Sequence, residues 1–139
     1  MTIKVNIKQL GKKKNKIAGV PFPLEHEPRT VRELIRECVH TCVRQYNERA
    51  AKSDDPDPLS AEQIADMSEI GKIAFGINYG DKLPDEEKAV TDAYQAYEDG
   101  LFRVFIGEDE AGELDSTVII SEGSEVTFIR LVMLAGRMW

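Results

Sequence analysis

The stretch "EVTFIRLVMLAGRMW", residues 125–139, gives the strongest indication of the architecture. Its apolar residues fall on both parities of an extended chain: Val126, Phe128, Val132 and Leu134 on one, and Ile129, Leu131 and Met133 on the other. An apolar run of this kind is typical of a strand in the middle of a sheet, with both faces covered. We therefore expect residues 125–134 to form a central strand that is buried on both faces.

Two more strands are expected at the start of the chain. The stretch "TIKVNIK", residues 2–8, alternates apolar and polar residues, which predicts a strand with one buried face. After a turn, apolar residues recur at every second position: Ala18, Val20, Phe22 and Leu24. Pro21 and Pro23 lie between them and cannot donate to a neighbouring strand, so residues 17–24 are expected at a sheet edge. Together the two runs predict an antiparallel hairpin.

The longest predicted helix begins at a capping box, "TVRE", residues 30–33. The Thr30 hydroxyl can accept from the Glu33 amide, while the Glu33 carboxylate can reach back to the Thr30 amide. From there to about Arg49, apolar residues recur at intervals of three and four, as one buried helix face requires. These residues are Val31, Leu34, Ile35, Cys38, Val39, Cys42, Val43 and Tyr46.

Two further helices are predicted at residues 60–75 and 85–98, and Gly100 ends the second in the usual way for a helix carboxyl end. The apolar period then returns to two, which predicts strands at residues 101–107 and 116–120 before the closing strand. One long helix packed across a mixed sheet is an α+β layer architecture. A chain of 139 residues is long enough to bury this core as a single domain.

The order of these segments resembles the ubiquitin-like β-grasp family. The segments that carry the resemblance are "TIKVNIKQL", "TVRELI" with its cap, and "LFRVFIGEDEAGELDSTVIISEGSEVTFIRLVML" followed by a glycine. In that family the first and last strands lie side by side and parallel at the sheet centre, the second strand is an edge, and one capped helix crosses the sheet. The resemblance therefore implies that residues 3–7 pair in parallel with residues 126–133. It covers residues 1–50 and 101–136, so residues 51–100 are expected to be a helical hairpin inserted within the single domain 1–139.

The resemblance also implies an alternative function, that of a protein modifier. Conjugated members of the family end in glycine, usually a pair, whose carboxylate is adenylated and transferred. This chain offers Gly136 as the candidate conjugation end, and Arg137-Met138-Trp139 would then be removed by a processing protease before an activating enzyme acts. The other interpretation is that Met138 and Trp139 pack as an apolar clasp on the domain, because a glycine after a strand usually just ends it.

The charge of the chain is unevenly distributed. The net charge is -7, but residues 1–52 hold twelve basic and five acidic residues (+7), whereas residues 53–139 hold six and twenty (-14). An acidic chain is a poor binder of nucleic acid, which requires a basic face. The basic cluster Lys12, Lys13, Lys14 and Lys16 is typical of a solvated hairpin turn, and it is also a candidate interaction surface. Such a dipolar surface would orient docking to a protein partner.

One short motif, Cys38, His40 and Cys42, contains residue types that can bind a metal ion or act as a nucleophile. On a helix, positions 38 and 42 share a face and position 40 points away, so the three cannot converge on one metal ion. Both cysteines lie on the apolar stripe, where thiols act as small hydrophobic side chains. A thiol enzyme that uses Cys42 is therefore the third-ranked function, because a nucleophilic cysteine needs an accessible, electropositive setting.

No other segment predicts chemistry. The acidic residues at positions 108–115 lack the spacing of a calcium loop, so they are expected to form a solvated turn. No phosphate loop, dinucleotide motif or membrane-spanning run is present, and we expect no cofactor, no metal and no catalytic residue. The sequence thus favours a non-enzymatic protein-interaction module of ubiquitin-like fold in the cytoplasm, with Trp139 and the lysine cluster as candidate contact residues.

Overall fold

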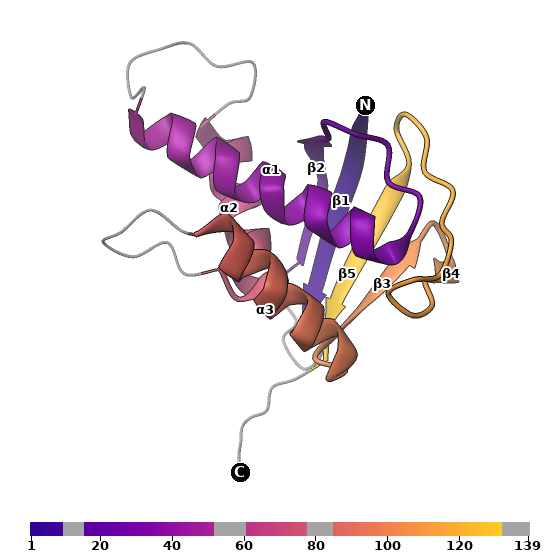
Figure 1. The fold of residues 1–139 in the computed structure, drawn as a ribbon. Helices are drawn as coiled ribbons and strands as arrows, with labels where there is room; N and C mark the ends of the chain where they lie inside the picture. The colour runs from indigo at the N-terminus through magenta and orange to yellow at the C-terminus, as the bar shows by residue number, and fades with distance from the viewer. Residues whose placement is uncertain (10–15, 52–60, 78–84, 132–139) are drawn as a thin grey trace.

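The computed structural model describes residues 1–9, 16–51, 61–77 and 85–131 (Figure 1). Within these residues, one five-stranded mixed sheet packs against three helices, which makes the fold α+β. The elements in chain order are β1 (Thr2–Gln9), β2 (Lys16–Pro23), α1 (Val31–Ala51), α2 (Ala61–Phe75), α3 (Glu86–Glu98), β3 (Phe102–Ile106), β4 (Asp109–Glu110) and β5 (Glu125–Arg130). The three predicted helices and the predicted first, second and last strands are therefore confirmed within the described ranges.

The strands follow the order β2-β1-β5-β3-β4 across the sheet. β1 and β5 run parallel at the centre, with Val5 opposite Val126 and Ile7 opposite Phe128. β2 pairs with β1 alone and lies at the edge of the sheet. Its two prolines lack an amide proton, but at an edge no second neighbouring strand needs one. The predicted parallel pairing of the first and last strands and the edge position of the second are both confirmed.

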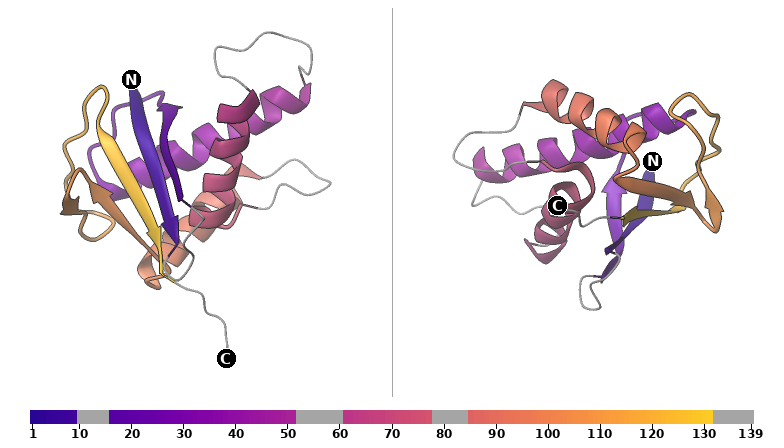
Figure 2. Two further views of the ribbon diagram at one scale, coloured as in Figure 1. Left: turned by 180° about the vertical axis from the view of Figure 1, so that it is seen from behind. Right: turned by 90° about the horizontal axis from the view of Figure 1, so that it is seen from below.

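All three helices lie on one side of the sheet, and α1 crosses it (Figures 1 and 2). For residues 125–131, the expectation that the closing strand is buried on both faces is therefore not met by the described part of the structure. Val126 and Phe128 are fully buried beneath the helices, whereas Ile129 and Leu131 on the other parity are only half-buried. The apolar character of β5 does place it centrally, but the layer that would cover its second face is not formed by any described element.

A β-bulge in β2 overturns one part of the predicted hairpin. The register with β1 shifts between Val5, which faces Val20, and Ile7, which faces Ile17. Gly19 adopts a φ of 72° at this point, and its amide donates to the Asn6 side chain at 2.8 Å. An extra residue in one strand turns the following side chains to the other face. Ala18 is consequently exposed, and Ile17 packs against the core in its place.

The cap of α1 matches the prediction in one half only. The Thr30 hydroxyl accepts from the Glu33 amide at 3.1 Å, as expected. The Glu33 carboxylate, however, accepts from the Arg29 amide at 2.8 Å and not from that of Thr30. The helix begins at Val31, and the Val31 amide, which has no acceptor within the helix, donates to the Ser116 carbonyl at 3.1 Å.

Residues 116–120 do not form the predicted short strand. Only Thr117 makes a bridge, to Thr30, and the Val118 amide donates to the Arg29 carbonyl at 2.9 Å. This segment pairs with the residues that precede α1 and not with the sheet. The strand that does form is β4, inside the acidic stretch expected to be a turn, where it closes a hairpin with β3. Both residues of β4 are exposed, so no alternation of apolar and polar residues could predict this strand.

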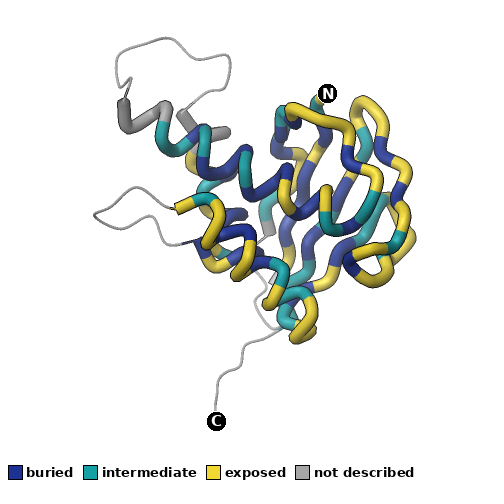
Figure 3. Tube along the Cα trace, in the orientation of Figure 1, coloured by how far each residue is buried: buried dark blue, intermediate teal, exposed yellow. Residues whose placement is uncertain are grey.

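The helical pair α2 and α3 belongs to the same core as the sheet. Met67, Ile70, Ala74 and Phe75 of α2 are buried in one apolar cluster with the strands and α1 (Figure 3). α2 contacts β1, β2 and β5, and α3 packs on α1 and β3. The two helices therefore share one hydrophobic core with the sheet, and their assignment as an insertion stays a prediction.

Candidate functional site

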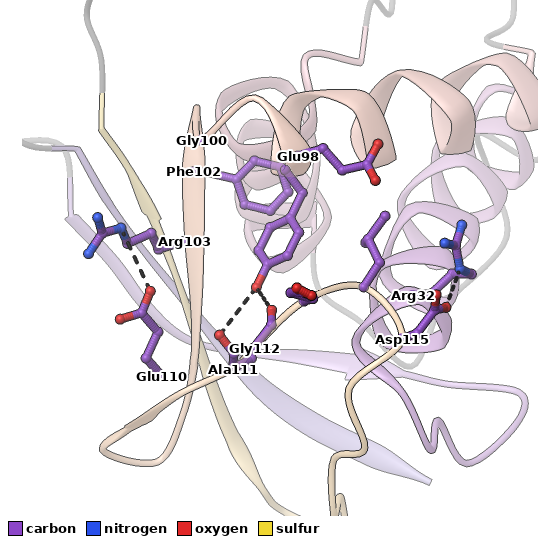
Figure 4. A pocket seen from close by; sticks show the side chains of 12 residues that line it. Arg32, Glu98, Gly100, Phe102, Arg103, Glu110, Ala111, Gly112 and Asp115 are labelled. Atoms are coloured by element: carbon purple, nitrogen blue, oxygen red, sulfur yellow. Dashed lines mark hydrogen bonds and ion pairs between the residues drawn. The ribbon is translucent and has the colours of Figure 1, made fainter.

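An open pocket of about 640 Å³ lies between α3, β3 and the loop that follows β4 (Figure 4). We call residues 111–116 the rim loop. The charged and aromatic residues that line the pocket are Arg32, Tyr97, Glu98, Phe102, Arg103, Glu110, Glu113 and Asp115. They come from four separate segments of the chain, so only the folded protein assembles them.

The rim loop is anchored to the beginning of α1. The amides of Val31 and Arg32 donate to the carbonyls of Ser116 and Leu114, at 3.1 and 2.7 Å. The first amides of a helix have no partner within the helix itself, so they are available to bind a passing segment. This contact fixes one side of the rim loop to the rigid end of a 21-residue helix.

Tyr97 anchors the other side of the rim loop. Its hydroxyl donates to the carbonyls of Ala111, at 3.3 Å, and Gly112. Its ring lies against that of Phe102, with 5.4 Å between the centroids. Burial, together with the charge of Glu110, raises the pKa of Tyr97 above its usual value, so the hydroxyl stays protonated and acts as a donor at neutral pH.

The floor of the pocket is part of the hydrophobic core. Phe102 is 1% exposed and meets the rings of Phe75 and Phe128 edge-on, at centroid distances of 5.7 and 6.1 Å. At the rim, a Cβ on Gly112 would lie 2.6 Å from the Ser116 hydroxyl oxygen, so the Ser116 side chain would have to move to admit one. The pocket therefore has a closely packed aromatic floor, and its rim loop is held by the hydrogen bonds from Tyr97 and from the beginning of α1.

Carboxylates outnumber cations around the pocket. Figure 4 shows the Arg103–Glu110 pair, at 3.7 Å, on one side and the Arg32–Asp115 pair, at 3.1 Å, on the other. The Asp115 carboxylate raises the pKa of Arg32, so this guanidinium stays charged. Glu98 and Glu113 make no ion pair with any described residue. Both extra charges are negative, so the pocket is suited to a cationic group.

The motif of two cysteines and a histidine is not a metal site in the described structure. Cys38 and Cys42 are 0% and 1% exposed, which confirms the predicted burial. Burial raises the pKa of Cys38 well above its usual value, so the reactive thiolate is disfavoured. His40 lies on the other side of the helix, between the carboxylates of Glu25 and Glu86. Within the described ranges no three metal-ligating side chains gather at one point.

The other sequence-predicted site residues are not tested by the structure. Lys12, Lys13, Lys14, Gly136 and Trp139 lie outside the described residues. Lys16 begins β2, but its side chain also lies outside what the structure describes. The lysine cluster and the carboxyl-terminal glycine therefore stay predictions.

The pocket residues were missed because they carry no motif. Tyr97 lies within the predicted helix at residues 85–98 without any feature that marks it, and the acidic stretch 108–115 is predicted to be a solvated turn. One signal was available in the spacing of Arg32, Arg36, His40 and Arg44, a basic row at intervals of four on a single face of the predicted helix. Such a row indicates that acidic partners pack against that face.

Two further observations bear on the function. Across the described helices, none is both long enough and apolar enough to cross a membrane. No protein-family model, no curated protein and no solved structure matches this chain.

Proposed function

We propose that this protein is a non-enzymatic protein-interaction module with a ubiquitin-like β-grasp core, and that its pocket binds a basic segment of a partner protein. The observation that carries the proposal is the pair of carboxylates Glu98 and Glu113, which form no ion pair with any described residue and line the pocket together with the partly exposed ring of Tyr97. A lysine or arginine side chain would find both opposite charge and an aromatic surface there.

The topology supports the β-grasp assignment. Parallel first and last strands at the sheet centre, an edge second strand and a capped helix across the sheet agree with the expected arrangement of that family. The helices α2 and α3 are additional to it. Since one fold hosts many functions, the proposed binding activity depends on the pocket and not on the topology.

The burial of both thiols and the pairing of His40 with carboxylates support a binding role over a catalytic one. Both thiols are buried, and both ring nitrogens of His40 face carboxylates. The charge distribution agrees with a basic partner, because residues 53–139, which supply most of the pocket, have a net charge of -14. Long-range attraction of this kind speeds encounter with an oppositely charged partner.

The proposal is tested with two synthetic peptides of equal length, one alternating arginine and serine and the other alternating glutamate and serine. Amide chemical shifts of ¹⁵N-labelled protein are followed during each titration. We expect the basic peptide to shift the amides of Gly100, Gly112 and Glu113, and the acidic peptide to leave them unchanged. Binding should weaken as salt is raised through the range in which exposed charges are screened.

Single-residue variants separate pocket binding from general attraction to an acidic protein. Glu98→Gln and Glu113→Gln should each weaken the basic peptide by about 1.5- to 5-fold, the range for one exposed ion pair. Glu69→Gln removes the same charge from the exposed face of α2 and should have little effect. Equal losses in all three variants, or shifts spread away from the pocket, would refute the proposed site.

A further inference from the structure

A charged seam joins α1 to α3. Arg32, Arg36, His40 and Arg44 follow one another at intervals of four along α1, so they share one face of the helix. The Arg32 guanidinium lies 5.0 Å from the ring centroid of Tyr94, and Arg36 forms a 2.9 Å ion pair with Glu87. Of the four basic side chains only histidine titrates near neutral pH. The seam therefore has one member whose charge can change under ordinary conditions.

His40 lies between two carboxylates that come from different elements. Its Nδ1 lies 2.8 Å from Oε1 of Glu86, at the first position of α3. Its Nε2 lies 3.1 Å from Oε2 of Glu25, in the segment that links β2 to α1. The second contact is an ion pair, although its N–H is not aimed well enough to count as a hydrogen bond. The imidazole side chain is 22% exposed, so water competes only weakly for it.

This arrangement requires a protonated ring. A neutral imidazole carries one N–H and one lone pair, so one of its nitrogens would face a carboxylate with no proton between them. The imidazolium ion has an N–H on each nitrogen and can serve both carboxylates at once. Protonation therefore decides whether His40 connects Glu25 to Glu86 or repels one of them.

The other charged groups around His40 keep the two carboxylates in place. On α1, Arg44 lies 3.8 Å from Glu25, and the buried Glu37 carboxylate accepts from the amides of Glu25 and His26 at 3.0 and 3.1 Å. The ring of His26 adds positive charge near Glu25. On α3, the neighbouring carboxylate of Glu87 already forms an ion pair with Arg36 of α1. Glu86 is thus the carboxylate of α3 that depends on His40.

We propose that Glu25, His40 and Glu86 form a pH-sensitive latch that holds the beginning of α3 against α1 when His40 is protonated. The latch is a property of the fold and does not depend on the proposed binding function. Since α3 also carries Tyr97 and Glu98, the latch acts on the helix that lines one side of the pocket.

The direction of the pH dependence follows from the electrostatics. Burial lowers the pKa of His40, but the carboxylates of Glu25 and Glu86 outweigh it, so the pKa lies above its usual 6.5. The latch is therefore fully closed below pH 6.5 and opens as pH rises through the raised pKa. The imidazole lowers the pKa of Glu25 below 4.5, so the latch also weakens as pH falls through that lowered value. Docking of α3 should be strongest between these two limits.

The first test is an NMR titration of the histidine ring protons, which resolves both histidines of the chain. In the wild type we expect His40 to titrate above 6.5. Glu86→Gln and Glu25→Gln should each lower that pKa, and Glu86→Gln should leave His26 unchanged. Glu87→Gln is the matched control, because it removes a charge from the same turn of α3 that pairs with Arg36 and not with His40. A His40 pKa at or below 6.5, or an equal fall in the control, would overturn the proposal.

The second test measures docking of α3 itself by amide hydrogen exchange. The ratio of protection factors of residues 89–93 at about pH 5.5 and about pH 8.5 should exceed one in the wild type, with one unit of pKa shift corresponding to about a tenfold ratio. The ratio should fall to one in His40→Gln and persist in His26→Gln. Should His40→Gln fold poorly, Glu86→Gln gives the same expectation with the histidine intact. An unchanged ratio in both latch variants would refute the latch.

Discussion

Tyr97→Phe tests whether the rim loop is held to α3 by one hydroxyl. The substitution keeps the ring and its 5.4 Å contact with Phe102, so it leaves no cavity in the core. It removes one proton, which the carbonyls of Ala111 and Gly112 share. A single hydroxyl proton counts as one hydrogen bond, worth about 0.5–1.5 kcal/mol net. Because Gly112 is exposed and its carbonyl can turn to water, we expect a loss of about 1 kcal/mol.

The loss is measured by urea unfolding and by calorimetry. A free-energy change of about 1 kcal/mol should lower the melting temperature by about 3–5 °C for a domain of this size. With a slope of about 2 kcal/mol per molar urea, the midpoint should fall by about 0.5 M. Amide exchange should quicken at Ala111 and Ser116 in the rim loop, while the central strands keep their protection.

Thr91→Val is the control for this experiment. It removes an exposed hydroxyl from the same helix, where Thr91 donates to the Glu87 carbonyl at 3.0 Å, and it keeps the shape of the side chain. We expect it to change stability by less than about 0.5 kcal/mol. If Tyr97→Phe costs no more than Thr91→Val, or if exchange quickens evenly along the whole chain, the hydroxyl does not anchor the rim loop.

Two further predictions concern the buried thiols and the carboxyl end. Cys38→Ala and Cys42→Ala should each lower the free energy of unfolding by about 1–2 kcal/mol through a small cavity, and neither thiol should react quickly with an alkylating reagent in the native protein; rapid labelling of both would contradict their burial. Intact-mass measurement of natively expressed protein decides the modifier alternative: we expect a chain that retains residues 137–139, and a species ending at Gly136 would support processing instead.

Part of the strand order could be predicted from the sequence, because the apolar residues and the prolines indicate which strands are central and which lie at an edge, while the parallel pairing of the first and last strands was implied by the resemblance to the β-grasp family. The two prolines of β2 predicted an edge, since a residue without an amide proton cannot serve a second neighbour. The apolar residues of β5 predicted a central position. Neither inference revealed that the described helices all cover the same face of the sheet, and Ile129 on the other face is only half-buried by the residues that the structure describes. The hydrophobic period of a single strand shows which of its faces is apolar, but it does not show which layer of the structure packs on that face.

The helices were predicted within a few residues because their signals are local. The Thr30 cap, the apolar stripe of α1 and Gly100, with a φ of 77°, each act over one turn of the chain. The bulge at Gly19 was missed because a bulge depends on the partner strand: the amide that Gly19 exposes is satisfied by Asn6 across the ladder. The alternation of apolar residues along β2 alone wrongly placed Ala18 on the buried face of the strand.

The three helices, the central position of β5, the edge position of β2 and the burial of both cysteines could be predicted from the sequence, because they depend on the hydrophobic period and on backbone chemistry within a short stretch. The pocket and the latch depend on the tertiary structure. The pocket brings Arg32 to Asp115, separated by 83 positions along the chain, and the latch brings His40 to Glu86, separated by 46. Such pairs carry no local signature, since each partner is an ordinary surface residue until folding places its opposite charge within a few ångströms.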